Sequence, residues 1–229
     1  MANKNTNLHK AKREKDDEFY TTYETIEKEL SHYKEQFKDK VVLCNCDDPY
    51  HSNFCKYFID YSNELKLKRL ICTSYKNIEL TYQPTLFDYD KPLPIPEKKN
   101  SRGLLLDLSA IDDNTRLNYH KQIETLNGNG DFRSAECIRY LKECDIVVTN
   151  PPFSLFKEFV STILEYDKRF LIIGNQNALT YKEIFPLLQS NKIWTGYQFG
   201  EIKFRVPDSS WLVRPITVQT ASTIFSNPY

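Results

Sequence analysis

The chain has 229 residues, enough for one substantial hydrophobic core, and its 31 basic and 31 acidic residues give a formal net charge of zero. No apolar run reaches the roughly 18 residues that a membrane helix requires, and no signal-peptide pattern begins the sequence. Composition therefore predicts a cytoplasmic protein with no membrane partner, and it lacks the overall positive charge typical of proteins that bind nucleic acids.

Positive charge is concentrated at the start of the chain. Residues 1–15 contain five lysine or arginine residues against a single glutamate, and they show no apolar periodicity. We predict a flexible basic arm there, which either contacts phosphate groups or is simply solvated.

Regular elements are predicted from residue 23 onward. Helical spacing predicts helices over 23–37 after a capping Thr21 or Thr22, over 54–61, over 135–141, over 154–164 with Ser154 as cap, and over 181–190. Apolar runs predict buried strands over 41–43, 69–73, 145–149 and 169–173. Prolines in residues 84–99 indicate an extended surface loop, and residues 127–130 indicate a turn. The alternation of strands and helices from 40 to 190 predicts an α/β fold, a mostly parallel sheet with helices on both faces.

The chemistry of the chain is concentrated in Asn150, Pro151, Pro152 and Phe153, directly after the strand predicted over 145–149. Asn150 precedes a proline and is held extended, and the prolines offer no N–H group, so the Pro151 carbonyl is available to an outside donor. The Asn150 side chain adds a second acceptor, and Phe153 adds an aromatic face.

Two acceptors beside an aromatic ring suit an NH2 group on a planar heterocycle. Accepting both hydrogens favours a pyramidal nitrogen whose lone pair can attack a methyl group, and the acceptors stabilise the positive charge that develops. The ring would stack on the base, and no general base is required. The residues therefore predict methylation of a planar amine, and a proline-rich turn without chemistry is the alternative.

The cysteines are expected to be reduced thiols in a cytoplasmic protein. Cys44, Cys46, His51 and Cys55 lie close together in the sequence, but no second paired cluster completes a tetrahedral set of zinc ligands. We therefore predict no metal site.

Four segments, in this order, resemble the adenine-specific DNA methyltransferases of the EcoRI type. They are residues 17–21 (Asp-Glu-Phe-Tyr-Thr), 44–49 (Cys-Asn-Cys-Asp-Asp-Pro), 130–132 (Gly-Asp-Phe) and 145–156, which includes Asn-Pro-Pro-Phe. The resemblance covers about residues 8–190 and implies a Rossmann-like, S-adenosylmethionine-dependent methyltransferase fold. It also implies double-stranded DNA with a flipped adenine as substrate, and a cognate restriction endonuclease that need not contact the chain.

The resemblance also assigns roles to individual residues. It implies that Phe19, Tyr20 and Thr21 line the methionine end of the cofactor, and that Cys46, Asp47 and Asp48 form the loop that holds its amino-acid portion. It implies that Asp131 accepts from the adenine amine of the cofactor, with Phe132 against its ring. The target adenine would be held by Asn150, Pro151, Pro152 and Phe153.

Simpler structural roles are open for several of these residues. Phe19 and Tyr20 could pack at the start of the first helix, Asp47 and Asp48 could serve as turn or cap residues, and Asp131 could belong only to the turn. The glycine-rich loop usual after the first strand is missing. Thr73 and Ser74 stand where an acid normally holds the cofactor ribose, which leaves the ribose-binding residue unassigned.

The domain organisation that follows is a basic arm over 1–15, a catalytic domain over 16–190 and a β-rich segment over 191–229. That last segment is either a truncated or reduced target-recognition region or part of the core and its solvated rim. The predicted activity is transfer of a methyl group to the N6 amine of adenine in DNA. The alternatives are methylation of RNA adenine or protein glutamine, and a shortened, inactive relative that only binds cofactor or DNA.

Overall fold

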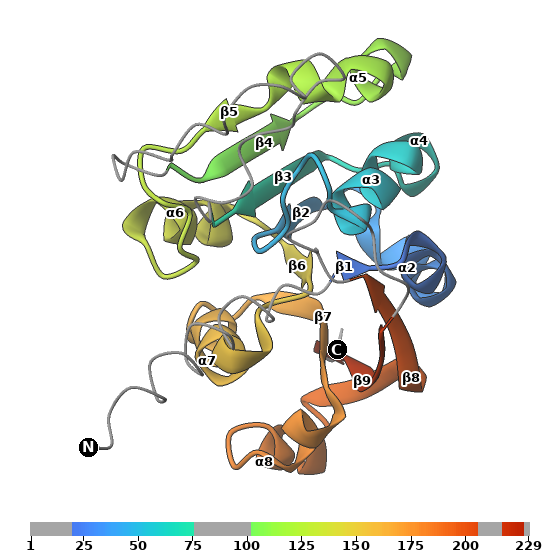
Figure 1. Cartoon of the computed structure of the whole chain (residues 1–229), viewed down its shortest axis with the longest axis vertical. Coiled ribbons are helices and arrows are strands. Elements are labelled where there is room, and N and C mark those ends of the chain that lie inside the picture. The colour runs from blue at the N-terminus through green and yellow to red at the C-terminus, as the bar shows by residue number, and fades with distance from the viewer. Residues whose placement is uncertain (1–19, 76–101, 206–216, 227–229) are drawn as a thin grey trace, which may run out of the picture.

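The computed structural model describes residues 20–75, 102–205 and 217–226. Within these ranges the strands form one sheet of nine, in the order β1-β8-β9-β7-β6-β2-β3-β4-β5 (Figure 1). The strands are β1 (Tyr20–Thr21), β2 (Val41–Cys44), β3 (Arg69–Ser74), β4 (Leu104–Leu108), β5 (Glu124–Thr125), β6 (Ile146–Thr149), β7 (Arg169–Asn175), β8 (Ile193–Arg205) and β9 (Thr217–Ser226). The α-helices are α2 (Tyr23–Leu30), α3 (Asn53–Asp60), α4 (Ser62–Leu65), α5 (Asp113–Asn118), α6 (Ala135–Glu143), α7 (Phe156–Glu165) and α8 (Phe185–Gln189). Short 3-10 helices cover Ser31–Phe37, Tyr119–Gln122, Phe153–Leu155 and Gln176–Thr180.

Parallel pairing occupies the centre of the sheet, where β3, β2, β6 and β7 lie side by side. Antiparallel strands extend this centre at both edges: β4 and β5 beyond β3, and β9, β8 and β1 beyond β7. The chain leaves β2 toward β3 on one side and returns to β6 on the other. The sheet therefore has a switch point between β2 and β6, where open α/β sheets bind ligands at the carboxyl ends of the strands.

Alternate residues of the central strands enter two separate cores, one on each face of the sheet. Val42, Cys44 and Val148 join the core under α2 and α3, whereas Leu43 and Val147 join the core under α6 and α7. Figure 1 shows these helix pairs on opposite sides of the sheet. The prediction of an α/β fold with helices on both faces is confirmed.

Most predicted elements are present, with shifted ends. The predicted helix over 23–37 is α-helical only to Leu30 and continues as a 3-10 helix to Phe37. The prediction of Ser154 as a helix cap is wrong: α7 begins at Phe156, because the Leu155 N–H donates to the Pro152 carbonyl (3.0 Å) and closes a 3-10 turn first. The basic arm and the proline-rich loop over 84–99 lie outside the described residues.

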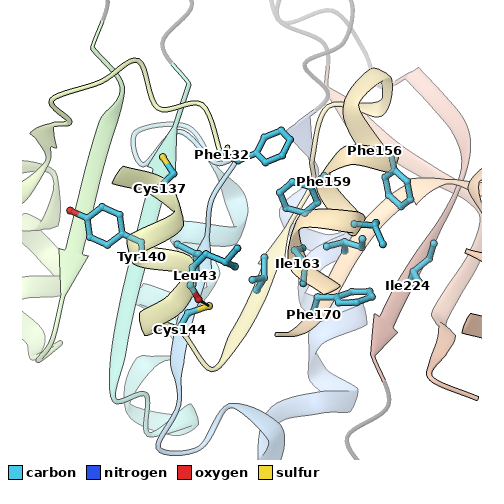
Figure 2. Packing of buried hydrophobic residues seen from close by; sticks show 14 of the residues in the cluster. Leu43, Phe132, Cys137, Tyr140, Cys144, Phe156, Phe159, Ile163, Phe170 and Ile224 are labelled. Carbon is cyan, nitrogen blue, oxygen red and sulfur yellow. Dashed lines mark hydrogen bonds between the residues drawn. The ribbon is translucent and has the colours of Figure 1, made fainter. Parts of the chain in front are cut away.

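The segment after residue 191 adds two strands to the same sheet. β9 pairs with β7, β8 pairs with β9, and the short β1 pairs with β8, so that Thr21 lies opposite Phe204. A bulge interrupts β8 between Thr195 and Phe199. Ile193 and Ile224 are fully buried in the core under α7, and Figure 2 shows Ile224 beside Phe170 of β7.

Candidate functional site

The predicted site residues come together at the carboxyl ends of β2, β3 and β6. The loop after β2 carries residues 45–52, the strand β6 leads into Asn150, and the loop before α6 carries residues 128–134. Two contacts fix the loop after β2 to the neighbouring strand ends: the Asp47 N–H donates to the Thr73 carbonyl of β3 (3.1 Å), and Thr149 of β6 donates to the Asp47 carboxylate.

The Asn150–Phe153 turn joins the end of β6 to the 3-10 helix that begins at Phe153. Asn150 and Pro152 are half-buried and Pro151 is buried. Among the described residues, no backbone N–H donates to the Pro151 carbonyl, whereas the Pro152 carbonyl accepts from Leu155. The Pro151 carbonyl is thus an acceptor that the protein backbone does not use. The side chain of Phe153 lies outside the described part of the structure, so its stacking role stays a prediction.

Asp47 is the most heavily engaged residue of the loop after β2. Its carboxylate is 7% exposed and accepts hydrogen bonds from the hydroxyl groups of Ser52 (2.7 Å) and Thr149. Burial raises the pKa of this carboxyl group to about 6, although the hydrogen bonds from Thr149, Ser52 and the Asn150 backbone oppose the rise. These contacts tie the predicted cofactor loop over residues 46–48 to the residues that are predicted to hold the target amine.

The neighbours of Asp47 have more local contacts. The Asp48 carboxylate accepts from the Tyr50 N–H (2.8 Å), and its backbone carbonyl accepts from the Ser52 N–H (2.7 Å), so Asp48 shapes the turn before α3. Cys46 is half-buried, and burial raises the pKa of its thiol well above the usual range. The Cys46 thiol is therefore protonated at neutral pH, unlike an activated nucleophile.

Gly130 places the loop that carries Asp131 against the end of β3. Its φ is +82°, and a Cβ there would lie 2.1 Å from the Ser74 carbonyl oxygen, so the backbones approach too closely for any other residue. Hydrogen bonds from Arg133 lower the pKa of Asp131, because the guanidinium donates to both carboxylate oxygens, at 2.9 and 2.7 Å. Arg133 therefore competes with any ligand amine for Asp131.

Phe132 lies mainly in the protein core. It is 5% exposed, and its ring packs edge-on against Phe159 of α7 with the centroids 5.2 Å apart (Figure 2). Arg133 also donates to Glu158 of α7 (2.7 Å). The loop that carries Asp131 to Arg133 is thus fixed against α7, the helix that follows the Asn150–Phe153 turn.

Of the three N-terminal residues predicted to line the cofactor, only Thr21 can be described in full. Phe19 lies outside the described residues, and Tyr20 is described by its backbone alone. The Thr21 carbonyl accepts from the Asn53 side chain at the start of α3 (2.7 Å), which brings β1 to the loop after β2. All four predicted site segments, the first of them through Thr21, therefore meet at this end of the sheet.

Several buried polar atoms at this end have no hydrogen-bond partner among the described residues. Among them are the Thr21 hydroxyl and the side-chain carbonyl of Asn45, on residues only 3% exposed. A buried oxygen without a donor is unfavourable unless a ligand supplies one. Both suit a positively charged amino group, such as the one at the methionine end of S-adenosylmethionine, so the residues present fit that cofactor.

Asn45, Ser52 and Thr149 were not identified from the sequence as site residues. One signal was present in each case: Asn45 and Thr149 are polar residues at the end of an apolar strand, and Ser52 stands two residues before the helical aromatic Phe54. In the described parts of the chain, no group of three His, Cys, Asp or Glu side chains is arranged to hold a metal ion. No helix there is long and apolar enough to cross a membrane.

Comparison with known proteins points to a single family. A family model described as adenine-specific methyltransferase EcoRI matches residues 7–222. The chain is 46% identical over 209 residues to Type II methyltransferase M.EcoRI of Escherichia coli, covering 87% of this chain and 58% of that protein. It is 36% identical over 212 residues to M.MpnI of Mycoplasma pneumoniae and 35% identical over 211 residues to M.MgeORF184P of Mycoplasma genitalium, both Type II methyltransferases. Each match covers 92% of this chain and 57% of the relative. The chain thus spans less than three-fifths of the length of these curated relatives.

Proposed function

Because this chain belongs to the EcoRI family of adenine-specific methyltransferases, we propose that it transfers a methyl group to the N6 amine of adenine in DNA. The observation that carries the proposal is the Asn150–Pro151 turn at the switch point of the sheet, with an uncommitted carbonyl on Pro151. The methyl donor is S-adenosylmethionine, which supplies an electrophilic methyl group when bound.

The protein's part in the reaction is to hold and polarise the amine. The Asn150 side-chain carbonyl and the Pro151 carbonyl accept its two hydrogens, which turns the nitrogen lone pair toward the methyl group. A fixed approach of the two reactants contributes most of the remaining rate acceleration. The proton then leaves to water, so the site needs no group with a pKa near 7.

Binding of the methyl donor is assigned to three places around the same end of the sheet. Thr21 and Asn45 offer buried oxygens to its ammonium group, and the loop over residues 46–48 encloses its amino-acid portion. Asp131 accepts from its adenine amine, in competition with Arg133. Phe19, Tyr20 and Phe132 complete this pocket in the proposal, Phe132 from within the core.

The target adenine leaves the double helix to reach the turn, since its amine cannot approach a buried methyl donor while paired. Extrusion costs a few kcal/mol, and stacking on the Phe153 ring offsets about 1–3 kcal/mol of it. The relatives are named Type II methyltransferases. The proposal accordingly includes protection of DNA from a cognate restriction endonuclease, without contact between the two proteins.

The test is methyl transfer from radiolabelled S-adenosylmethionine to duplex DNA, RNA and a cell protein extract, each offered separately. We expect label in DNA. Asn150→Ala should lower the rate of methyl transfer by at least about 100-fold with cofactor binding unchanged, since one acceptor of the developing charge is removed. Asn114→Ala, at an exposed position of α5, is the matched control.

The acceptor that receives label separates the rival functions. Label confined to RNA or protein would replace the DNA assignment while keeping the chemistry of the turn. Cofactor binding without transfer to any acceptor would refute catalysis and support a regulator that only binds cofactor or DNA.

A further inference from the structure

Thr149 occupies the last position of β6, one residue before Asn150, and is completely buried. Its hydroxyl group donates to the Asp47 carboxylate, 102 positions away in the sequence. Because β2 and β6 are parallel neighbours with Leu43 opposite Val147, the loop after β2 and the turn after β6 begin side by side. The Thr149–Asp47 hydrogen bond joins the two at that point.

The Asp47 carboxylate is itself fixed from several sides. Ser52 donates to the other carboxylate oxygen (2.7 Å) while its own oxygen accepts from the N–H groups of Phe54 and Cys55, at 3.1 and 3.2 Å, at the start of α3. The Asp47 N–H donates to the Thr73 carbonyl of β3. Asp47 cannot move without disturbing α3, β3 or both, which makes it a rigid anchor for Thr149.

Stability alone does not account for a carboxylate at this place. A buried ionised group is costly to desolvate, and apolar residues of similar volume often replace such a group at no loss of stability. A short polar contact next to Asn150 does, however, restrict the direction in which the backbone leaves β6. Displacement of a reacting group by 1 Å lowers a catalytic rate by about 100-fold.

We propose that Thr149 is a positioning residue for methyl transfer, which acts through its hydrogen bond to Asp47 to fix the Asn150–Phe153 turn against the predicted cofactor loop. This inference rests on the proposed function for its kinetic consequence. Its structural consequence, an ordered turn, is independent of any substrate.

The test compares Thr149→Val, which keeps the shape and removes the hydroxyl group, with Thr149→Ser, which keeps the hydroxyl group. Ser62→Ala is the matched control, because it removes a buried hydroxyl group that lies at the start of α4, outside the Asp47 network, and donates to the Ile59 carbonyl (2.9 Å). Three quantities are measured on the full chain: single-turnover methyl transfer to duplex DNA at saturating S-adenosylmethionine, the Kd for S-adenosylmethionine, and amide hydrogen exchange in residues 150–156.

For Thr149→Val we expect a transfer rate about 100-fold lower, a cofactor Kd within about threefold of wild type, and faster exchange in residues 150–156. Thr149→Ser and Ser62→Ala should remain within about threefold of wild type in rate, because only the hydrogen bond to Asp47 is expected to matter for the rate. Unchanged exchange in Thr149→Val would overturn the proposal, and so would an unchanged transfer rate or a loss confined to cofactor affinity.

The exchange measurement also separates this inference from the proposed function. If wild-type protein transfers no methyl group to DNA, the proposed function fails. Faster exchange in Thr149→Val but not in Thr149→Ser would then still support the role of Thr149 in fixing the turn, and equal exchange in both variants would refute it.

Discussion

At pH 7 the Asp47 carboxyl group is largely ionised although only 7% of the residue is exposed, since burial raises its pKa to about 6. Between the unfolded value near 3.8 and this folded value, the folded protein binds more protons than the unfolded chain. The contribution of Asp47 to stability therefore falls as the pH rises from about 4 to about 6, by about 3 kcal/mol in total.

Asp47→Asn removes this titration, so we expect its free energy of unfolding to fall by about 2 kcal/mol less than that of the wild type between pH 4 and pH 7. Urea unfolding of both proteins at the two pH values measures the difference, and the other carboxyl groups cancel in the comparison. An identical pH dependence in the two proteins would show that the Asp47 pKa is not raised by folding.

Gly130 provides a second prediction at the scale of single residues. Gly130→Ala puts a side chain on a residue whose φ is +82°, and its Cβ would lie 2.1 Å from the Ser74 carbonyl oxygen. The loop must therefore shift or adopt a strained backbone. We expect a loss of about 3 kcal/mol of stability, measured by thermal unfolding. Gly128→Ala is the control, because its Cβ would meet only a Glu136 carboxylate oxygen at 3.5 Å. Equal Tm values for the two variants would contradict the prediction.

Sequence patterns pointed to residues that the fold brings together, but not to the contacts between them. The double proline determines local backbone geometry, so the form of the turn at Asn150 followed from the sequence alone. The pairing of Asp47 with Thr149 spans 102 positions and depends on β2 and β6 being neighbours, which no local pattern encodes. The engagement of Asp131 by Arg133 is local, since the two residues are two positions apart, and it was not predicted either.

At the scale of elements, α2 is fastened to the bulge of β8 by one buried carboxylate. Glu29 is 2% exposed and accepts from the N–H groups of Tyr197 (2.9 Å) and Gln198 (2.7 Å) and from the Tyr33 hydroxyl group (3.0 Å). The bulge leaves these two N–H groups without a strand partner, and a carboxylate has enough lone pairs to accept from all three donors.

Glu29→Gln should therefore destabilise the protein by about 1–3 kcal/mol, because an amide offers one acceptor oxygen and turns an NH2 group toward another donor. Urea unfolding measures the loss, and hydrogen exchange at Tyr197 and Gln198 locates it. Glu24→Gln lies on the exposed side of the same helix and should change stability by less than about 0.5 kcal/mol. Comparable effects of the two substitutions would rule out a specific role for Glu29.

The positions of the four central strands and of the helices packed on them followed from periodicity, but α5 and the edge strands β4 and β5 were not predicted, and strand partners did not follow. The four central strands have continuous apolar runs, which favour burial on both faces and hence a parallel arrangement. β4 pairs antiparallel with β3, and β9 pairs antiparallel with β7. No local sequence pattern in these strands indicates their partners or the antiparallel direction of the pairing. Antiparallel or parallel pairing is decided by the path of the chain, a property of the whole molecule.

At the scale of the whole molecule, the ends of the described chain complete one sheet. The sequence predicted a boundary at residue 190, yet β9 covers the edge of β7 over five paired residues, from Leu171 to Asn175. Ile193 and Ile224 fill the core beneath α7. β8 in turn holds β1, which carries Thr21 to the site. Geometry at the site therefore depends on strands remote from it in sequence.

Removal of residues 191–229 should consequently abolish cooperative folding, because it exposes the hydrogen-bonding edge of the central strand β7, opens a buried core and leaves β1 without a partner. Thermal unfolding followed by circular dichroism, together with S-adenosylmethionine binding, measures the outcome. Removal of residues 227–229 alone leaves every described strand intact and serves as the control. A truncated chain that unfolds cooperatively and binds the cofactor would instead establish residues 16–190 as an independent domain, with β8 and β9 free to serve another role such as contact with DNA.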